Sequence, residues 1–168
     1  MQAAVMTPPD SAEQGDEHAE LAQRAAAGDL AATREVLALV RPRVSMVVRR
    51  ILGSHPDADD VVQETQIALV KALPAFRGDC RVASFAARIA VRTAMAARKR
   101  DQRQRERQRE LEQTRAVDEP TAPSPRQRLV RERRLELLRA LLAELPAGQG
   151  ETLALRFIAG ATLDEIAA

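Results

Sequence analysis

The chain has 168 residues, of which 26 are Lys or Arg and 24 are Asp or Glu, and its formal net charge is +2 at pH 7. A single cysteine excludes an internal disulfide, and two isolated histidines leave a structural zinc site without ligands. The sequence has neither an apolar run of about 18 residues nor a signal peptide. We therefore expect a cytoplasmic protein without membrane insertion.

The first part of the chain is predicted to be an acidic, disordered tail over residues 1–16. It contains Pro8-Pro9 and shows no helical period, and residues 1–20 hold five acidic groups and no Lys or Arg. Helical patterns follow at residues 17–27, 30–52, 57–73 and 82–113, with Pro42 as a kink or break in the second. No strand pattern competes with them. The fold class is therefore predicted to be all-α, with a helical domain over residues 17–113.

The helix predicted from Asp57 to Leu73 has two unlike faces. Asp57 is suited to cap its start. Its opposite, outward arc places Ile67 and Val70 among acidic and amide groups. Such a face either binds another protein or packs against a helix of the same domain, and the pattern leaves both readings open. The arc expected in the core consists of Val61, Val62, Thr65, Ala68, Leu69, Ala72 and Leu73.

A turn and a basic helix come next. Gly78 makes the turn Phe76-Arg77-Gly78-Asp79 sterically easy. Residues 88–109 contain nine Lys or Arg against two acidic residues, a local net charge of +7. This charge indicates either a polyanion-binding surface or a solvated, charged helix end. The cationic stripe consists of Arg88, Arg92, Lys99 and Arg103, and the neighbouring buried arc is expected to consist of Val82, Phe85, Ala86, Ile89, Ala90, Thr93 and Ala97.

The last part of the chain is predicted to be a linker followed by short helices. Residues 114–127 contain three prolines and few hydrophobic residues, which is typical of a linker. Residues 128–168 then begin with a helix that stops at Pro146. A shorter helix over residues 149–159 is closed by Gly160, and Thr162-Leu163-Asp164-Glu165 reads as a capping box. The apolar face of the first of these helices consists of Leu138, Leu141, Leu142 and Leu145.

These motifs, in this order and spacing, resemble the extracytoplasmic-function (ECF) sigma factors of bacterial RNA polymerase. The resemblance to region 2 of that family rests on Asp60 to Thr65, on Phe76 to Asp79 and on Arg88-Ile89-Ala90. A second resemblance, to the start of region 4, which is a helix-turn-helix, rests on Leu145-Pro146, Gln149, Leu155-Arg156-Phe157, Gly160 and Thr162 through Ala167. The resemblance covers residues 17–110 and 128–168.

The resemblance implies a sigma factor that binds core RNA polymerase and directs promoter recognition and opening at the minus-10 element during transcription initiation. Promoter DNA and an anti-sigma factor are further expected partners. No enzymatic activity, metal or cofactor is expected. The family's polymerase-binding positions correspond here to Asp60, Gln63, Glu64 and Ile67. Its DNA-binding positions correspond to Phe76, Arg77, Gly78, Asp79, Ser84, Arg88, Arg92 and Lys99.

The chain departs from the family pattern in its aromatic residues. It has no Trp or Tyr, and Gln66, Val70, Val82, Phe85 and Ala87 stand where relatives usually place aromatics. Because base stacking contributes about 1–3 kcal/mol per base, promoter opening is expected to be weaker or to need a near-ideal promoter. Phe76 and Phe85 are expected to lie in the core.

A second departure concerns the recognition helix. The sequence stops six residues after Thr162, which leaves no residues for that helix. Residues 128–168 are therefore expected to be mobile, or to pack against residues 17–110 or a partner. Two other functions stay open. One is a truncated sigma-like protein that binds polymerase or an anti-sigma partner without promoter activity, and the other is a general helical nucleic-acid binder.

Overall fold

The computed structural model describes residues 13–113, 136, 137, 139, 141, 142 and 144–167. These residues form helices and no strand, which confirms the all-α prediction. The linker predicted over residues 114–127 lies outside them, whereas residues 13–16 of the predicted tail belong to the first helix. The elements are α1 (Glu13–Ala26), α2 (Leu30–Leu52), α3 (Ala58–Ala72), the 3-10 turn η1 (Leu73–Ala75), α4 (Val82–Gln113), α6 (Ala147–Leu153), the π-helical turn η2 (Ala154–Ile158) and α7 (Leu163–Ala167).

Helix α2 runs without interruption through Pro42. Of the kink or break predicted at Pro42, the break is therefore wrong. This residue lies on the exposed side of the helix, where a proline removes one backbone donor without opening a gap in the core. The helix begins at Asp29, whose Oδ1 accepts hydrogen bonds from the backbone N–H groups of Ala31 (2.8 Å) and Ala32 (3.0 Å). It ends at Gly53, which has φ 70°.

The start of α3 also differs from the prediction. Asp57 occupies the cap position, but its side chain makes no capping hydrogen bond. Its backbone N–H donates instead to His55 Nδ1 (3.2 Å). Asp59 and Asp60 in the first turn still complement the positive end of the helix dipole. Beyond η1, Gly78 has φ 83°, which confirms why the turn before α4 needs glycine.

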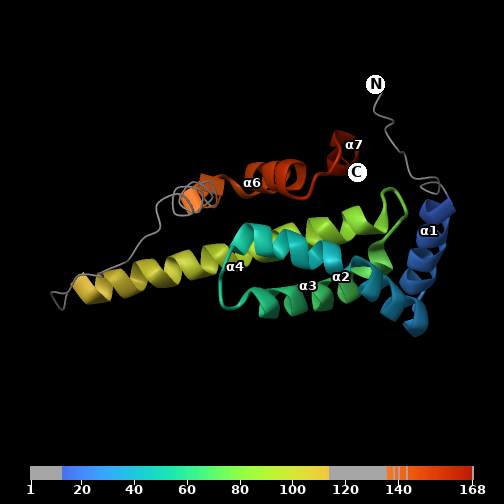
Figure 1. Cartoon of the computed structure of the whole chain (residues 1–168), viewed down its shortest axis with the longest axis horizontal. Coiled ribbons are helices and arrows are strands. Elements are labelled where there is room, and N and C mark those ends of the chain that lie inside the picture. The colour runs from blue at the N-terminus through green and yellow to red at the C-terminus, as the bar shows by residue number, and fades with distance from the viewer. Residues whose placement is uncertain (1–12, 114–135, 138, 140, 143, 168) are drawn as a thin grey trace, which may run out of the picture.

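The core lies where α2, α3 and α4 pack side by side, with α1 across one end (Figure 1). Thr65 is fully buried, and its hydroxyl is satisfied by donating to the Val61 carbonyl (2.7 Å). The buried side of α4 differs from the predicted arc. Ala87 and Val91 are buried in addition, because α4 contacts α2 and α3 as well as α6 and η2, whereas Phe85, Ile89, Thr93 and Ala97 are only half-buried. The largest fully buried side chains include Leu69, Leu73, Val36, Val40, Val44, Val47, Val48 and Val91.

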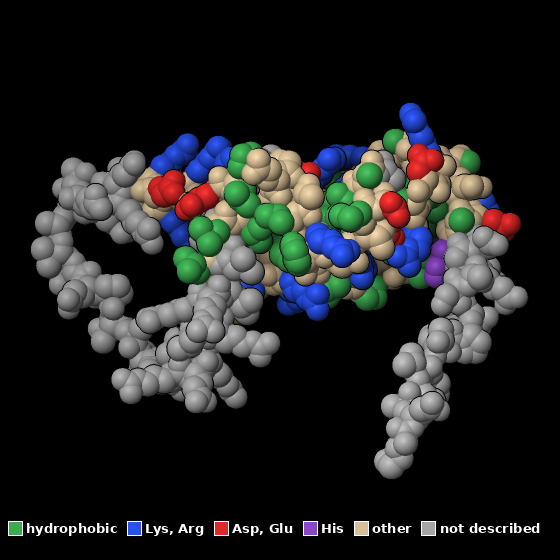
Figure 2. All heavy atoms as spheres, turned by 90° about the horizontal axis from the view of Figure 1, so that it is seen from above, with side chains coloured by type: hydrophobic (Ala, Val, Ile, Leu, Met, Phe, Trp, Pro, Cys, Tyr) green, Lys and Arg blue, Asp and Glu red, His purple; other side chains and the backbone are tan. Residues whose placement is uncertain are grey.

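The C-terminal segment, residues 136–167 as far as the structure describes them, lies along α4 (Figure 1). Of the alternatives expected for this part of the chain, packing against residues 17–110 is the one observed. Its side chains Ala154, Leu155, Ala159 and Ala161 are buried in the same hydrophobic core as those of α2 and α4. Viewed from the side of the C-terminal segment, the surface carries hydrophobic side chains between Arg and Lys (Figure 2). Leu137, Leu141, Leu153, Phe157 and Leu163 are exposed.

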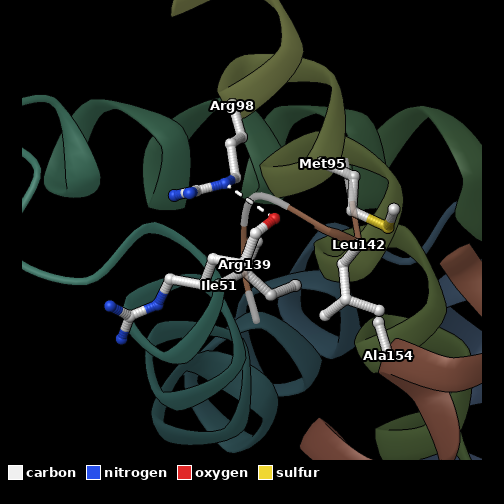
Figure 3. A pocket seen from close by; sticks show the side chains of 6 residues that line it. All are labelled: Ile51, Met95, Arg98, Arg139, Leu142 and Ala154. Atoms are coloured by element: carbon white, nitrogen blue, oxygen red, sulfur yellow. Dashed lines mark hydrogen bonds between the residues drawn. The ribbon is translucent and has the colours of Figure 1, made fainter. Parts of the chain in front are cut away.

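Arginine side chains join the C-terminal segment to the helical bundle through backbone carbonyls. Arg43 donates to the Ala159 carbonyl, and Arg50 Nη1 donates to the Ile158 carbonyl (3.1 Å). Arg98 Nε donates to the Arg139 carbonyl (3.1 Å), beside a cavity of about 10 Å³ (Figure 3). The residues around this cavity come from α2, α4 and the C-terminal segment, so the two parts of the chain share a well-filled interface. They are Ile51, Met95, Arg98, Arg139, Leu142 and Ala154.

No helix in the described residues is long and apolar enough to cross a membrane.

Gly150 provides a test of this interface. A Cβ at this buried glycine would lie 2.7 Å from Met95 Cε and 2.9 Å from the backbone oxygen of Leu142, and the latter cannot move aside as a side chain can. We expect Gly150→Ala to release residues 147–166 while α2, α3 and α4 stay folded, as hydrogen exchange would measure.

The matched control is Gly148→Ala in the same helix, because a Cβ there would meet nothing within 4 Å. Alanine at an open helical position stabilises by about 0.5–1 kcal/mol relative to glycine. Equal protection of residues 147–166 in both variants would contradict the close packing of Met95 and Leu142 around Gly150.

Candidate functional site

One candidate surface is the outward side of α3, called here the α3 face and formed by Asp60, Gln63, Glu64, Ile67 and Val70. Ile67 is 58% exposed and Val70 is 42% exposed. Packing of these two side chains against another helix of the domain is therefore excluded within the described residues. The polar members of the face are exposed as well. The face thus presents two branched apolar side chains among acidic and amide groups.

The acidic side of the α3 face borders α4. Glu64 Oε2 accepts a hydrogen bond from Arg100 Nη2 (3.1 Å), which ties α3 to α4. Nearby, His55 Nε2 lies 3.3 Å from Asp101 Oδ2. These four residues line a groove of about 320 Å³, together with Asp57, Asp60 and Gln104 among others. The described residues contain no group of His, Cys, Asp and Glu placed to hold a metal ion.

A second surface begins at the loop before α4. Phe76 is buried in the core, as predicted, and packs edge-on against Phe85, with ring centroids 5.2 Å apart. Phe85 is half-buried and packs against the core. Arg77, Gly78 and Asp79 are exposed. Beside them lies an open cavity of about 230 Å³ whose lining combines apolar, acidic and basic groups. It is formed by Ala75, Phe76, Arg77, Asp79, Cys80, Phe85 and Arg88.

Cys80 shows how the environment of this cavity acts on a titratable group. Burial raises the pKa of its thiol, and the positive charge of Arg88 opposes that increase. The thiolate form is therefore disfavoured at neutral pH.

The rest of the second surface lies on α4. The predicted DNA-binding residues Ser84, Arg88 and Arg92 follow one another at intervals of four residues, so they form one line along the helix, the Ser84–Arg92 line. Lys99 and Arg103 are exposed farther along α4. The turn, the Ser84–Arg92 line and the cationic end of α4 therefore all lie on α4 or on the loop before it.

Glu165 of α7 contacts this line. Its Oε1 accepts hydrogen bonds from Ser84 Oγ (2.6 Å), Arg81 Nη2 (2.8 Å) and Arg81 Nε (3.0 Å). The Glu165 backbone carbonyl accepts one from Arg88 Nη2. Farther along, Arg92 Nε lies 3.0 Å from Glu151 Oε2. The sequence analysis did not identify Arg81 as a site residue. Its position between the turn and α4 was the signal that could have identified it.

The predicted capping box at the start of α7 is confirmed. The Thr162 backbone N–H donates to Glu165 Oε2 (2.9 Å), and the Glu165 N–H donates to Thr162 Oγ1 (3.2 Å). The Ser84 hydroxyl, the Thr162 N–H and the Arg81 guanidinium together lower the pKa of Glu165 to about 2. The carboxylate is therefore ionised throughout the neutral range.

A pKa this low predicts how pH acts on the contact. Because the folded pKa lies below the ordinary value of 4.5, ionised Glu165 stabilises the contact above that pH, and the stabilisation is lost as pH falls toward 2. We expect a carboxyl titration followed by NMR to give a midpoint near 2, and Ser84→Ala to raise it. Ser45→Ala, on α2, serves as the control. An unshifted midpoint in the unmutated protein would contradict the contact.

Three comparisons agree on what this chain is similar to. The family profile "Sigma-70 region 2" matches residues 37–104, which include the α3 face and the Ser84–Arg92 line. The "ECF RNA polymerase sigma factor SigD" proteins of Mycobacterium tuberculosis and Mycobacterium bovis are 33% identical over 166 residues, covering 95% of this chain and 76% of theirs.

The fold is also that of a solved structure, CnrH in complex with the cytosolic domain of CnrY. Its TM-score is 0.51 at 24% identity, covering 89% of this chain and 80% of the other. Sigma factors are non-enzymatic initiation factors of transcription. The region 2 match includes both candidate surfaces, and the SigD proteins are 33% identical to this chain over 95% of its residues. The chain therefore belongs to the ECF sigma factor family of bacterial RNA polymerase.

Proposed function

We propose that this sigma factor binds core RNA polymerase through the α3 face and directs promoter recognition and opening at the minus-10 element through the turn before α4 and the basic residues of α4. In this role it acts in the bacterial cytoplasm. The polymerase carries out the chemistry, and the sigma factor supplies binding and positioning. The exposure of Ile67 and Val70 among the polar residues of the α3 face is the observation that most favours this function.

The α3 face has the composition of a protein-binding surface. Burying a branched apolar side chain that is otherwise 58% exposed is favourable, and apolar residues ringed by polar ones are typical of binding hot spots. Asp60 and Glu64 beside Ile67 favour a basic partner surface. The opposite side of the same helix is fixed in the core, so the face is rigid before binding.

The DNA-binding role rests on charge and on the cavity beside the turn. The end of α4 extends beyond the other helices (Figure 1), and Arg103, Arg105 and Arg107 on it are exposed. An arginine fork suits phosphate oxygens, and the local net charge of +7 over residues 88–109 favours a polyanion. The cavity of about 230 Å³ offers a place for an unpaired base.

The two phenylalanines limit how such a base is held. Phe76 and Phe85 pack against each other, so their rings serve the core and give little area for stacking. Base capture then depends on hydrogen bonds donated by Arg77 and Arg88 and accepted by the Asp79 carboxylate. Because stacking contributes about 1–3 kcal/mol per base, promoter opening is expected to need a near-ideal promoter.

A second function is favoured by the C-terminal segment. Its exposed Leu153, Phe157 and Leu163 offer an apolar surface to another protein. In this alternative the chain is a sigma-like interaction protein that binds polymerase or an anti-sigma partner without promoter activity. We retain the division into a helical domain over residues 17–113, a linker over 114–127 and region-4-like helices over 128–168 as part of both proposals.

The polymerase-binding role is tested by changing the α3 face. We expect Gln63→Ala combined with Ile67→Asp to abolish assembly with core polymerase in pull-down and sedimentation experiments, because an aspartate replaces the apolar contact. Circular dichroism should be unchanged, since both side chains are exposed. Leu30→Asp is the matched control, because Leu30 is 73% exposed on a different helix. Assembly of the double variant at normal affinity would exclude the α3 face.

The DNA-binding role is tested through salt dependence. Removing one phosphate contact lowers the slope of log affinity against log salt by roughly 0.7 for single-stranded DNA. We expect Arg88→Ala, Arg92→Ala and Lys99→Ala each to reduce the slope, measured with labelled single-stranded DNA, while polymerase binding is retained. An unchanged slope in all three variants would remove these residues from the DNA interface. Run-off transcription from core polymerase then separates the first function from the second.

A further inference from the structure

Three of the residues proposed to contact DNA are already occupied by the chain itself. Ser84 and Arg88 contact Glu165, and Arg92 pairs with Glu151. We propose that the C-terminal segment is an intramolecular latch on the DNA-facing side of α4, with the Glu165 carboxylate bound where a DNA phosphate binds in the open state. This inference rests on the DNA-binding role proposed for α4.

The partners of Glu165 are those that a phosphate oxygen takes. Its Oε1 accepts two N–H groups of the Arg81 guanidinium and one hydroxyl, within 2.6–3.0 Å. Guanidinium forks and hydroxyl groups supply most side-chain contacts to nucleic-acid phosphates. The Glu165 side chain is only 13% exposed, whereas Arg81 is 76% exposed. The carboxylate is thus enclosed while its cationic partner stays open to a competing anion.

Glu151 extends the latch along α4. It pairs with Arg92, two helical turns beyond Ser84 on the same line, so carboxylates meet the Ser84–Arg92 line at both of its ends. Lys99 lies farther along α4 than the contacts of Glu165 and Glu151, and among the described residues it forms no ion pair. DNA can therefore engage Lys99 first and then compete for Arg92, Arg88 and Ser84.

The ion pairs of the latch with α4 are weak, which makes their displacement by DNA physically reasonable. Helices α6 and α7 contain seven and five residues, and helices this short are not stable by themselves. Their order depends on the buried side chains of the segment, on hydrogen bonds from Arg43 and Arg50 to its backbone carbonyls, and on ion pairs. The arginines of those ion pairs, Arg81 and Arg92, are 76% and 64% exposed. Exposed ion pairs contribute little and weaken with salt. A polyanion supplies several phosphates in place of two carboxylates.

Closure lowers the apparent affinity for DNA, because only the open fraction binds. Glu165→Gln is the sharpest variant for testing this effect. Glutamine retains the capping box of α7, which uses Oε2 and Thr162, but loses the charge that holds Arg81 through Oε1. Asp164→Asn removes the same charge from the neighbouring, exposed position. Any general effect of net charge on DNA binding is therefore common to both variants.

The experiment uses the full chain and a labelled single-stranded oligothymidylate at low salt. We expect Glu165→Gln to bind at least about threefold more tightly than Asp164→Asn, since a larger fraction is open. Gly150→Ala opens the segment without changing charge, and it should also bind more tightly than its control Gly148→Ala. In the unmutated protein, saturating oligothymidylate should lower the hydrogen-exchange protection of residues 147–166.

Two results would overturn the latch while leaving the proposed function intact. One is binding that depends on Lys99 but is the same in Glu165→Gln and Asp164→Asn and in both glycine variants. The other is full protection of residues 147–166 in the saturated complex. If no variant binds oligothymidylate, the DNA-binding role itself fails, and the latch fails with it.

Discussion

The close packing of α4 against α2 is the interaction on which the rest of the structure depends. Ala86, Ala90 and Ala94 are fully buried on α4, and side chains this small let the helix axes approach closely. The valines of α2 fill the space that the alanines leave, and they include Val40, Val44, Val47 and Val48. Because α4 is held so firmly along its first turns, its opposite side can carry mutually repelling cations without loss of the fold.

The same packing links the two proposed binding surfaces. Helix α3 lies against α2 and α4 on one side, and its exposed side contains Ile67 and Val70. The Arg100–Glu64 pair joins α3 to α4 at the edge of that face. A partner bound to α3 therefore sets the position of α4 through direct contacts rather than through a flexible connection, as a factor that places DNA on a polymerase requires.

The sequence predicted the helical fold, the bounds of α4 and the outward arc of α3, because amphipathic periodicity determines which side of a long helix is buried. It left open whether Ile67 and Val70 on that arc are exposed or pack against another helix. It failed where a local signal competes with tertiary packing. Pro42 does not break α2, since an exposed position tolerates a missing donor. Asp57 lacks a capping bond, because backbone geometry decides whether a suitable side chain reaches the N–H groups. The contacts of Glu165 join segments about 80 residues apart, for which periodicity carries no signal.

The uneven distribution of charge along the chain explains what carboxylates of the C-terminal segment achieve when they pair with arginines of α4 and of the loop before it. The formal net charge of the whole chain is only +2, while residues 88–109 carry +7. Such a cationic surface attracts any nucleic acid, and that attraction is independent of sequence. Carboxylates of the same chain that neutralise Arg81 and Arg92 reduce binding to every polyanion, yet they are displaced most readily by a ligand that makes additional contacts. Because only the open fraction binds, closure lowers the apparent affinity for every polyanion by the same factor. Nucleic acid that binds only weakly then no longer displaces the carboxylates, whereas a ligand that makes more contacts still does.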